Sequence, residues 1–215
     1  MINLQTIYSQ ARTISIFEQL SIRFSAIQGF LTKGEGFVLY LFSSMGPGQG
    51  EVVEIGSYKG LSTCWIAEGL KDSQRGCVTA IDHFEGSVEH TDQEKADIFV
   101  FFTTNVSTQK LSEHVISIKS SSETAVQMWN EKIKKPIRLL FIDGDHSYEG
   151  VKKDFELWSG LVIEGGIIGF HDYMSKGYPG VTRFVNELLA HTSSYDDVMQ
   201  ANTLKFIQKK KVTRL

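Results

Sequence analysis

The chain has 215 residues, of which 41% are hydrophobic, so it has room for one soluble α/β domain with a full core and a small appendage. A formal net charge of −3 at pH 7 argues against binding nucleic acid through a general basic field. No apolar run approaches the ~20 residues that span a bilayer, and the N-terminus lacks the basic start and apolar core of a secretion signal, so we expect a cytoplasmic protein without a membrane partner.

Helices are expected at the start of the chain. Apolar residues recur near helical spacing between Ile14 and Ile27, and again around Phe37. The glycines and the proline of residues 46–50 then break this pattern. We therefore expect residues 1–45 to form an N-terminal helical segment, which is a lid, an oligomer contact in a homodimer, or simply part of the core packing.

Apolar runs alternate with helical patterns from Glu51 onward, which is the arrangement of the βα units that build a parallel sheet. Strands are expected at residues 51–56, 77–82, 115–119 and 166–170, and in the apolar run that starts at Pro136 and ends before Asp143. Helices are expected at about residues 60–70, 91–105, 122–132, 148–161 and 180–190, although residues 99–102 also suit a strand. Two closing strands, at 197–200 and 204–209, predict an antiparallel edge. The fold class is therefore α/β, with residues 46–215 forming a Rossmann-like, doubly wound, mostly parallel seven-stranded sheet behind the N-terminal helical extension.

Four of the predicted strands carry an acidic residue at or next to their carboxyl end: Glu54, Asp82, Asp143 and Asp172. The carboxyl ends of parallel strands share one edge of a sheet, where such proteins bind their ligands. Carboxylates that converge there repel one another unless cations neutralise them. We therefore expect a site for a positively charged ligand at this edge.

The turn at residues 54–60 indicates the class of ligand. It has the outer glycines of a nucleotide-binding turn, but Tyr58 replaces the middle glycine that lets a pyrophosphate approach the backbone. Tyr58 therefore argues against NAD and FAD as ligands. It is compatible with an adenosine ligand that carries no phosphates. Asp82 ends the second strand, where an acid accepts hydrogen bonds from ribose hydroxyls. S-adenosylmethionine, an adenosine with a positive centre, satisfies both features.

The sequence also resembles a known family. The resemblance is carried by Glu-Ile-Gly-Ser-Tyr-Lys-Gly at 54–60, Ala-Ile-Asp at 80–82, Phe-Ile-Asp-Gly-Asp-His-Ser-Tyr at 141–148 and Gly-Gly-Ile-Ile-Gly-Phe-His-Asp-Tyr at 165–173. These stretches are similar to class I S-adenosylmethionine-dependent methyltransferases, and to the branch with an Asp-Gly-x-His-x-Tyr motif. That branch includes metal-dependent O-methyltransferases that act on sugars of natural products. The resemblance covers about residues 50–190, and it implies methylation of a hydroxyl group on a small molecule.

By this resemblance, the cofactor lies along the same edge of the sheet. Glu54, Gly56 and Gly60 would line its methionine part, and Asp82 would hold its ribose. Further cofactor contacts are implied at Ser57, Tyr58, Thr63, His83, Phe84, Ser121, Ser122 and Asp143. The two serines fall where family members contact the adenine ring, but they also suit a plain helix start.

The resemblance further implies a divalent metal, Mg²⁺ or Mn²⁺, held by Asp143, His171 and Asp172. Relatives often have an acid in place of His171. Because Mg²⁺ prefers oxygen ligands, His171 favours a softer ion such as Mn²⁺, Fe²⁺ or Zn²⁺, or indicates that no metal is bound. His146, three residues after Asp143, matches the catalytic base of relatives; otherwise it only anchors the turn by hydrogen bonding.

Two other functions stay open at this point. The same fold could serve as a non-catalytic protein that holds an adenosine ligand, or as a scaffold. A nicotinamide-dependent reductase on a similar sheet is the other alternative, and Tyr58 weighs against it.

Overall fold

The computed structural model describes residues 4–86 and 97–211. A seven-stranded sheet forms its centre, with the strand order β3-β2-β1-β4-β5-β7-β6. The strands are β1 (Glu51–Ile55), β2 (Val78–Asp82), β3 (Val115–Lys119), β4 (Ile137–Ile142), β5 (Val162–Phe170), β6 (Tyr195–Ala201) and β7 (Leu204–Lys209). The first five strands run parallel, and β7 pairs antiparallel with both β5 and β6. The predicted α/β fold class, a mostly parallel sheet with an antiparallel edge, is confirmed.

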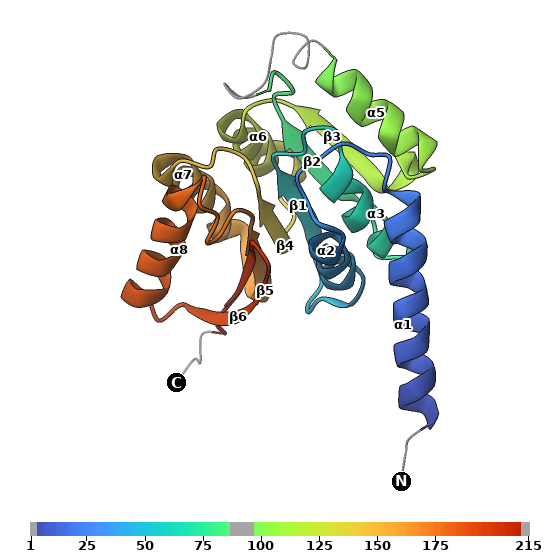
Figure 1. The fold of residues 1–215 in the computed structure, drawn as a ribbon. Helices are drawn as coiled ribbons and strands as arrows, with labels where there is room; N and C mark the ends of the chain where they lie inside the picture. The colour runs from blue at the N-terminus through green and yellow to red at the C-terminus, as the bar shows by residue number, and fades with distance from the viewer. Residues whose placement is uncertain (1–3, 87–96, 212–215) are drawn as a thin grey trace.

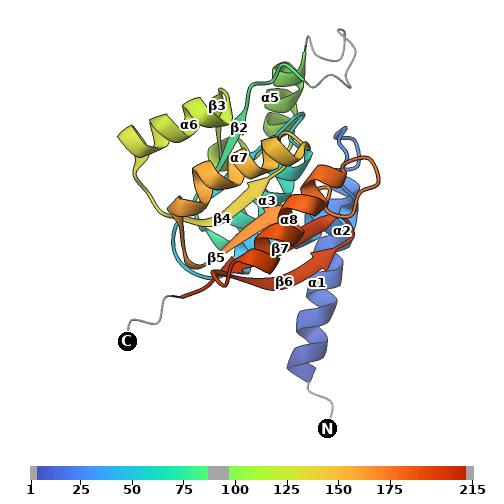
Figure 2. The ribbon, with the colours of Figure 1, turned by 90° about the vertical axis from the view of Figure 1, so that its left-hand side faces the viewer.

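Helices cover both faces of this sheet (Figures 1 and 2). They are α1 (Leu4–Arg23), α2 (Lys33–Met45), α3 (Leu61–Ser73), α5 (Ile98–Thr108), α6 (Ser122–Met128), α7 (Tyr148–Trp158) and α8 (Pro179–His191). Buried side chains of α1, α2, α3 and α5 form one core cluster, and those of α6, α7 and α8 form a second. Because both faces are covered, the central strands are mainly apolar, and all six residues of β4, including Arg138, are buried.

The N-terminal segment consists of two different parts. Residues 5–10 of α1 are exposed, and this end of the helix extends away from the sheet (Figure 1). In contrast, Leu20 and the following residues Phe24 and Ile27 are buried in the core, as are Leu39 and Tyr40 of α2. The predicted roles of residues 1–45 as a lid or an oligomer contact stay predictions.

Two helix predictions changed in detail. The helix expected at 91–105 is observed as α5, and the strand alternative for residues 99–102 is wrong. The part of that prediction that falls on residues 87–96 lies outside the described residues. The helix expected at 122–132 ends earlier, because α6 gives way to a wider π turn, η2 (Trp129–Ile133). Within the two described stretches, 4–86 and 97–211, no helix is long and apolar enough to cross a membrane.

Candidate active site

A cavity of about 1030 Å³ opens at the carboxyl ends of the parallel strands, where β1 and β4 are neighbours and the strand order reverses. Open α/β sheets bind their ligands at this place. The segment between α1 and α2, residues 28–31, closes one side of the cavity. The predicted site residues that line it are Gly56, Ser57, Tyr58, Asp82, His83, Ser121, Ser122, Asp143, His146, His171 and Asp172.

Four predicted cofactor residues do not line this cavity: Glu54, Gly60, Thr63 and Phe84. Glu54 and Thr63 lie fully buried behind the turn that follows β1. Gly60 precedes α3 as its N-cap residue, with a φ of 87°. Phe84 packs against aromatic rings of α5. Direct cofactor contacts of these four residues therefore stay predictions.

The turn after β1 owes its shape to a glycine and an acid. Gly56 has a φ of 84°, and a Cβ atom at this position would collide with the backbone of Asp143 at the end of β4. Asp82 then holds the turn, because its Oδ2 accepts the backbone N–H groups of Ser57 at 2.9 Å and of Tyr58 at 2.8 Å. Its Oδ1 accepts the backbone N–H of Phe84 at 2.6 Å. Asp82 thus joins β1 and β2 at the cavity floor, in addition to its predicted role as a ribose acceptor.

Glu54 forms a buried acidic group beneath this turn. Its Oε2 accepts hydrogen bonds from the hydroxyls of Ser57 and Thr63, while Oε1 has no hydrogen-bond partner within the described residues. Burial raises the pKa of Glu54 to about 7, although the hydroxyls of Ser62, Thr63 and Ser57 oppose this effect. A buried acceptor without a donor is costly, so Oε1 is suited to a donor that a ligand supplies.

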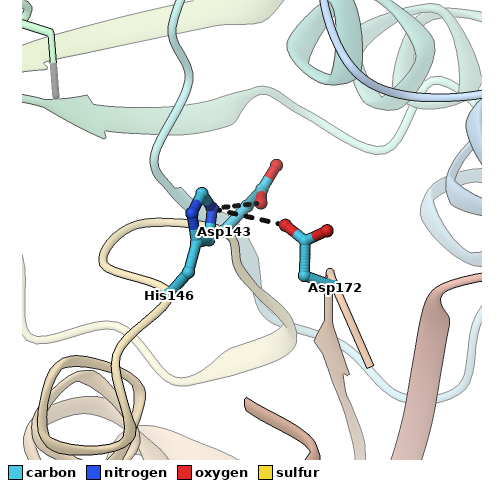
Figure 3. A group of neighbouring side chains, drawn as sticks. All are labelled: Asp143, His146 and Asp172. Carbon is cyan, nitrogen blue, oxygen red and sulfur yellow. Dashed lines mark ion pairs between the residues drawn. The ribbon is translucent and has the colours of Figure 1, made fainter. Parts of the chain in front are cut away.

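Four titratable side chains meet on the other side of the cavity, after β4 and β5. His146 Nε2 lies 3.6 Å from Asp143 Oδ1 and 3.4 Å from Asp172 Oδ2 (Figure 3). His171 Nδ1 lies 3.0 Å from Asp143 Oδ1 and 3.2 Å from Asp172 Oδ2. Asp143, His146 and Asp172 offer ligand atoms that all lie within 4.8 Å of one another, as a metal site requires. The structure therefore brings together every residue predicted for the metal and for the base.

The backbone at Asp172 is strained. Its φ of 60° lies in the left-handed region, which costs a non-glycine residue roughly 1–2 kcal/mol. Such strain persists only where the surrounding structure enforces it, and it is common at functional sites. Here it turns the Asp172 carboxylate back toward His146 and His171 directly after β5 ends.

The two histidines differ in access. The side chain of His146 is 29% exposed and its ring packs against Tyr178, with 4.3 Å between ring centroids. The side chain of His171 is only 5% exposed. Burial alone would lower the pKa of His171, but Asp143, Asp172 and Glu35 outweigh it and raise that pKa to about 12. His171 is thus a buried cation, while His146 faces the cavity.

The pKa values of two carboxylates around His171 are lowered in return. Burial would raise the pKa of Asp143, but the two neighbouring histidines keep it below its ordinary value. Burial would also raise the pKa of Glu35, yet His171 and the Thr203 and Thr32 donors lower it to about 2. Both acids are therefore ionised around the His171 cation.

Ser121 and Ser122 serve the helix start as well as the cavity wall. Ser121 is the N-cap of α6, and its hydroxyl accepts the backbone N–H of Thr124 at 3.3 Å. The Ser122 hydroxyl accepts the indole N–H of Trp158 at 2.9 Å. The helix-start interpretation is confirmed, and the adenine contact stays a prediction.

Sequence reasoning missed Glu35 and Tyr178, and it expected the segment 28–31 only as part of a lid formed by residues 1–45. Thr32 and Glu35 have capping-box spacing, and the structure shows that box at the start of α2. That signal predicts only a helix start. Nothing in it indicates that the same Glu35 carboxylate lies beside His171.

A family model described as a methyltransferase domain matches residues 53–173 of the chain. Among curated proteins, an uncharacterized protein of Acanthamoeba polyphaga mimivirus is 46% identical over 55 residues, and this match spans 25% of either chain. The chain thus aligns with about a quarter of the length of that relative.

Solved structures share the fold over nearly the whole chain. The O-methyltransferase from Bacillus cereus in complex with SAH is 23% identical, with 92% of this chain and 91% of that chain covered and a TM-score of 0.63. The O-methyltransferase TomG from Streptomyces achromogenes, involved in tomaymycin synthesis and in complex with SAM, is 16% identical, with 98% and 100% covered and a TM-score of 0.64. These likenesses show a shared fold.

Proposed function

The chain belongs to the family of methyltransferase domains, and from this we propose that it transfers the methyl group of S-adenosylmethionine to a hydroxyl group of a small molecule. The supporting observation is that Asp82, Asp143 and Asp172 line one cavity at the point where the strand order reverses. Glu54 adds a fourth carboxylate directly behind this cavity. Such a concentration of negative charge favours a cationic methyl donor.

The donor fits the half of the cavity built by β1, β2 and β3. Glu54 lies behind the turn that follows β1, and its Oε1 lacks a donor, which the ammonium group of S-adenosylmethionine would supply by reaching past that turn. Asp82 and His83 lie at the end of β2, where ribose hydroxyls are bound in related sheets. Ser121 and Ser122 lie farther along the wall, where the adenine ring would be held.

The acceptor then fits the half built by β4, β5 and residues 28–31. Methyl transfer from a sulfonium needs no further activation of the methyl group, so the protein mainly holds donor and acceptor in line. His146 is the group that removes the hydroxyl proton, because it faces the cavity while His171 is buried and paired. The acidic residues Asp143 and Asp172 stabilise the imidazolium that this step forms.

A divalent metal fits the donor set of this half. Asp143 and Asp172 would offer oxygen atoms, and His171 would offer Nδ1 once the metal displaces its proton, a mixture that suits Mn²⁺, Fe²⁺ or Zn²⁺ better than Mg²⁺. The nitrogen–oxygen spacings of 3.0–3.6 Å between the two histidines and the two acids bring the groups that would hold the ion close together. A bound metal would orient the acceptor oxygens and lower the pKa of the hydroxyl group.

The N-terminal segment would contribute to the acceptor pocket. Residues 28–31 line the cavity, which supports a lid-like role for residues 1–45.

The exposed apolar side chains of Ile7, Tyr8 and Ile14 on α1 suit the homodimer contact. Sedimentation of a chain that lacks residues 1–12 tests this, since loss of a dimer is expected and an unchanged oligomeric state contradicts it.

Calorimetric titration with S-adenosylhomocysteine is the direct test of the donor site. We expect binding with one molecule per chain, followed by methylation of at least one compound in a panel of sugars, polyols and catechols. A protein that binds neither S-adenosylmethionine nor S-adenosylhomocysteine would rule out the proposed function. Binding without turnover on the whole panel would favour the non-catalytic alternative.

A further inference from the structure

Glu35 is a buried carboxylate that lies beside the active site without lining its cavity. It is 1% exposed and belongs to the first turn of α2, in the N-terminal segment. Its Oε2 lies 4.0 Å from Nε2 of His171, on the side of the ring that faces away from Asp143 and Asp172. His171 is therefore enclosed by three carboxylates, one of which comes from a distant part of the chain.

Both oxygens of Glu35 are fixed by hydrogen-bond donors. Oε1 accepts the backbone N–H of Thr203 at 2.9 Å and its hydroxyl at 2.6 Å. Oε2 accepts the backbone N–H of Thr32 at 2.8 Å and its hydroxyl at 2.7 Å. The Thr203 hydroxyl also lies 3.5 Å from His171 Nε2. A carboxylate with four such bonds cannot rotate freely, so its charge has a fixed place next to the ring.

We propose that Glu35 is a positioning residue, which with Thr203 holds the His171 ring so that Nδ1 faces Asp143 and Asp172. A histidine ring that is held by an acid at one nitrogen has a fixed orientation at the other nitrogen. Removal of Glu35 would let the ring turn, and the two site carboxylates would lose their partner at 3.0 and 3.2 Å. This inference rests on the proposed function for its catalytic consequence alone.

The geometry also places an acid at each nitrogen of the His171 ring. Asp143 and Asp172 both contact Nδ1, and the Glu35 carboxylate lies near Nε2. The contacts couple three elements: α2 through Glu35, the β6–β7 hairpin through Thr203, and the end of β5 through His171. The N-terminal segment would thus influence the reaction from within the core.

Glu35→Gln is the central variant. The amide keeps the size of the carboxylate, but it places an N–H₂ group against the donors of either Thr32 or Thr203. Thr203→Val is the milder variant, because it removes the hydroxyl and keeps the backbone donor. Glu68→Gln is the matched control, since Glu68 is also a buried helical carboxylate and pairs with Arg23, at 2.8 Å, away from the cavity.

Nitrogen-15 NMR of the histidine rings in the ligand-free protein gives the first measurement, with the His171 signals assigned by their loss in His171→Gln. We expect Glu35→Gln to shift the His171 ring resonances, Thr203→Val to shift them less, and Glu68→Gln to leave them in place. Unshifted His171 resonances in Glu35→Gln would overturn the inference. If Glu35→Gln does not fold, unshifted His171 resonances in Thr203→Val would overturn the inference instead.

Kinetics with an acceptor that the wild type methylates give the second measurement. We expect Glu35→Gln to lower kcat by about 10–100-fold. The KM for S-adenosylmethionine should stay within about twofold, because Glu35 lies outside the cofactor half of the cavity. An equal loss of kcat in Glu68→Gln would reduce the role of Glu35 to stability and overturn its positioning role. Failure of the wild type to bind S-adenosylhomocysteine would instead remove the proposed function and leave the NMR result unaffected.

Discussion

Glu54 is the buried acid whose ionisation the proposed cofactor would change. Its pKa is raised to about 7 because burial penalises the carboxylate more than the nearby hydroxyls support it. In the unliganded fold, this group therefore favours stability at low pH and opposes it increasingly as pH rises from its ordinary value of 4.5 toward 7. A cationic ligand at Oε1 reverses the preference, because it needs the ionised form.

Binding of S-adenosylhomocysteine should accordingly weaken as the pH falls through about 7. The expected loss is up to about tenfold in affinity for each pH unit below that point, since one proton must leave Glu54 on binding. Calorimetry across a pH series measures it. Glu54→Gln should bind more weakly and show a flatter profile, and an identical pH profile in the two proteins would contradict the role of Glu54.

Substitution of His171 should mainly affect stability, whereas substitution of His146 should mainly affect turnover. His171→Ala leaves buried carboxylates without their cation, so we expect the free energy of unfolding to fall by about 3–5 kcal/mol. His146→Ala removes a ring that is only partly buried and should cost far less stability. It should instead lower turnover by about 10²-fold or more, with the affinity for S-adenosylhomocysteine retained. Urea unfolding and steady-state kinetics separate these outcomes, and full activity of His146→Ala would exclude it as the base.

At the scale of elements, the turn between β1 and α3 brings the cofactor half of the site together. Gly56 allows β1 to pass closely beside the end of β4, because any side chain there would meet the backbone of Asp143. Gly76, before β2, provides a comparison. Its φ of 86° is close to the 84° of Gly56, but nothing lies within 4 Å of the position of its missing Cβ atom.

Gly56→Ala should therefore lose S-adenosylhomocysteine binding and destabilise the protein by clearly more than Gly76→Ala. The second substitution carries only the backbone strain, roughly 1–2 kcal/mol. The difference between the two isolates the contact of β1 with β4. Thermal unfolding together with calorimetric binding measures it, and equal effects at both positions would show that the close approach of the strands is unimportant.

At the scale of the whole molecule, the sheet could be predicted because its signals are local. Apolar runs such as Leu139 to Ile142 end in an acid, and the carboxyl ends of parallel strands necessarily share an edge. The acids at Asp82, Asp143 and Asp172 therefore fell into one cavity as expected. The burial of Glu54 behind that cavity depends on side-chain direction, which strand patterns do not specify.

The partners of His171 could not be predicted in the same way. Thr203 lies 168 residues from Glu35 in sequence, and their contact exists only because the β6–β7 hairpin packs onto the start of α2. A capping box and a hairpin turn are each recognisable locally. Their meeting at His171 is a property of the assembled core.

The proposed metal site would depend on the whole fold, because the donor atoms of Asp143, His146, His171 and Asp172 converge only when β4 and β5 are paired. A ligand that binds only the folded state stabilises it by mass action. Mn²⁺ should thus raise the melting temperature of the wild type and leave the variant with Asp143→Asn and Asp172→Asn unchanged. EDTA should abolish turnover, and Mn²⁺ should restore it better than Mg²⁺ because imidazole ligands favour the softer ion. Turnover that is indifferent to the chelator would show that the His171 cation alone neutralises these carboxylates.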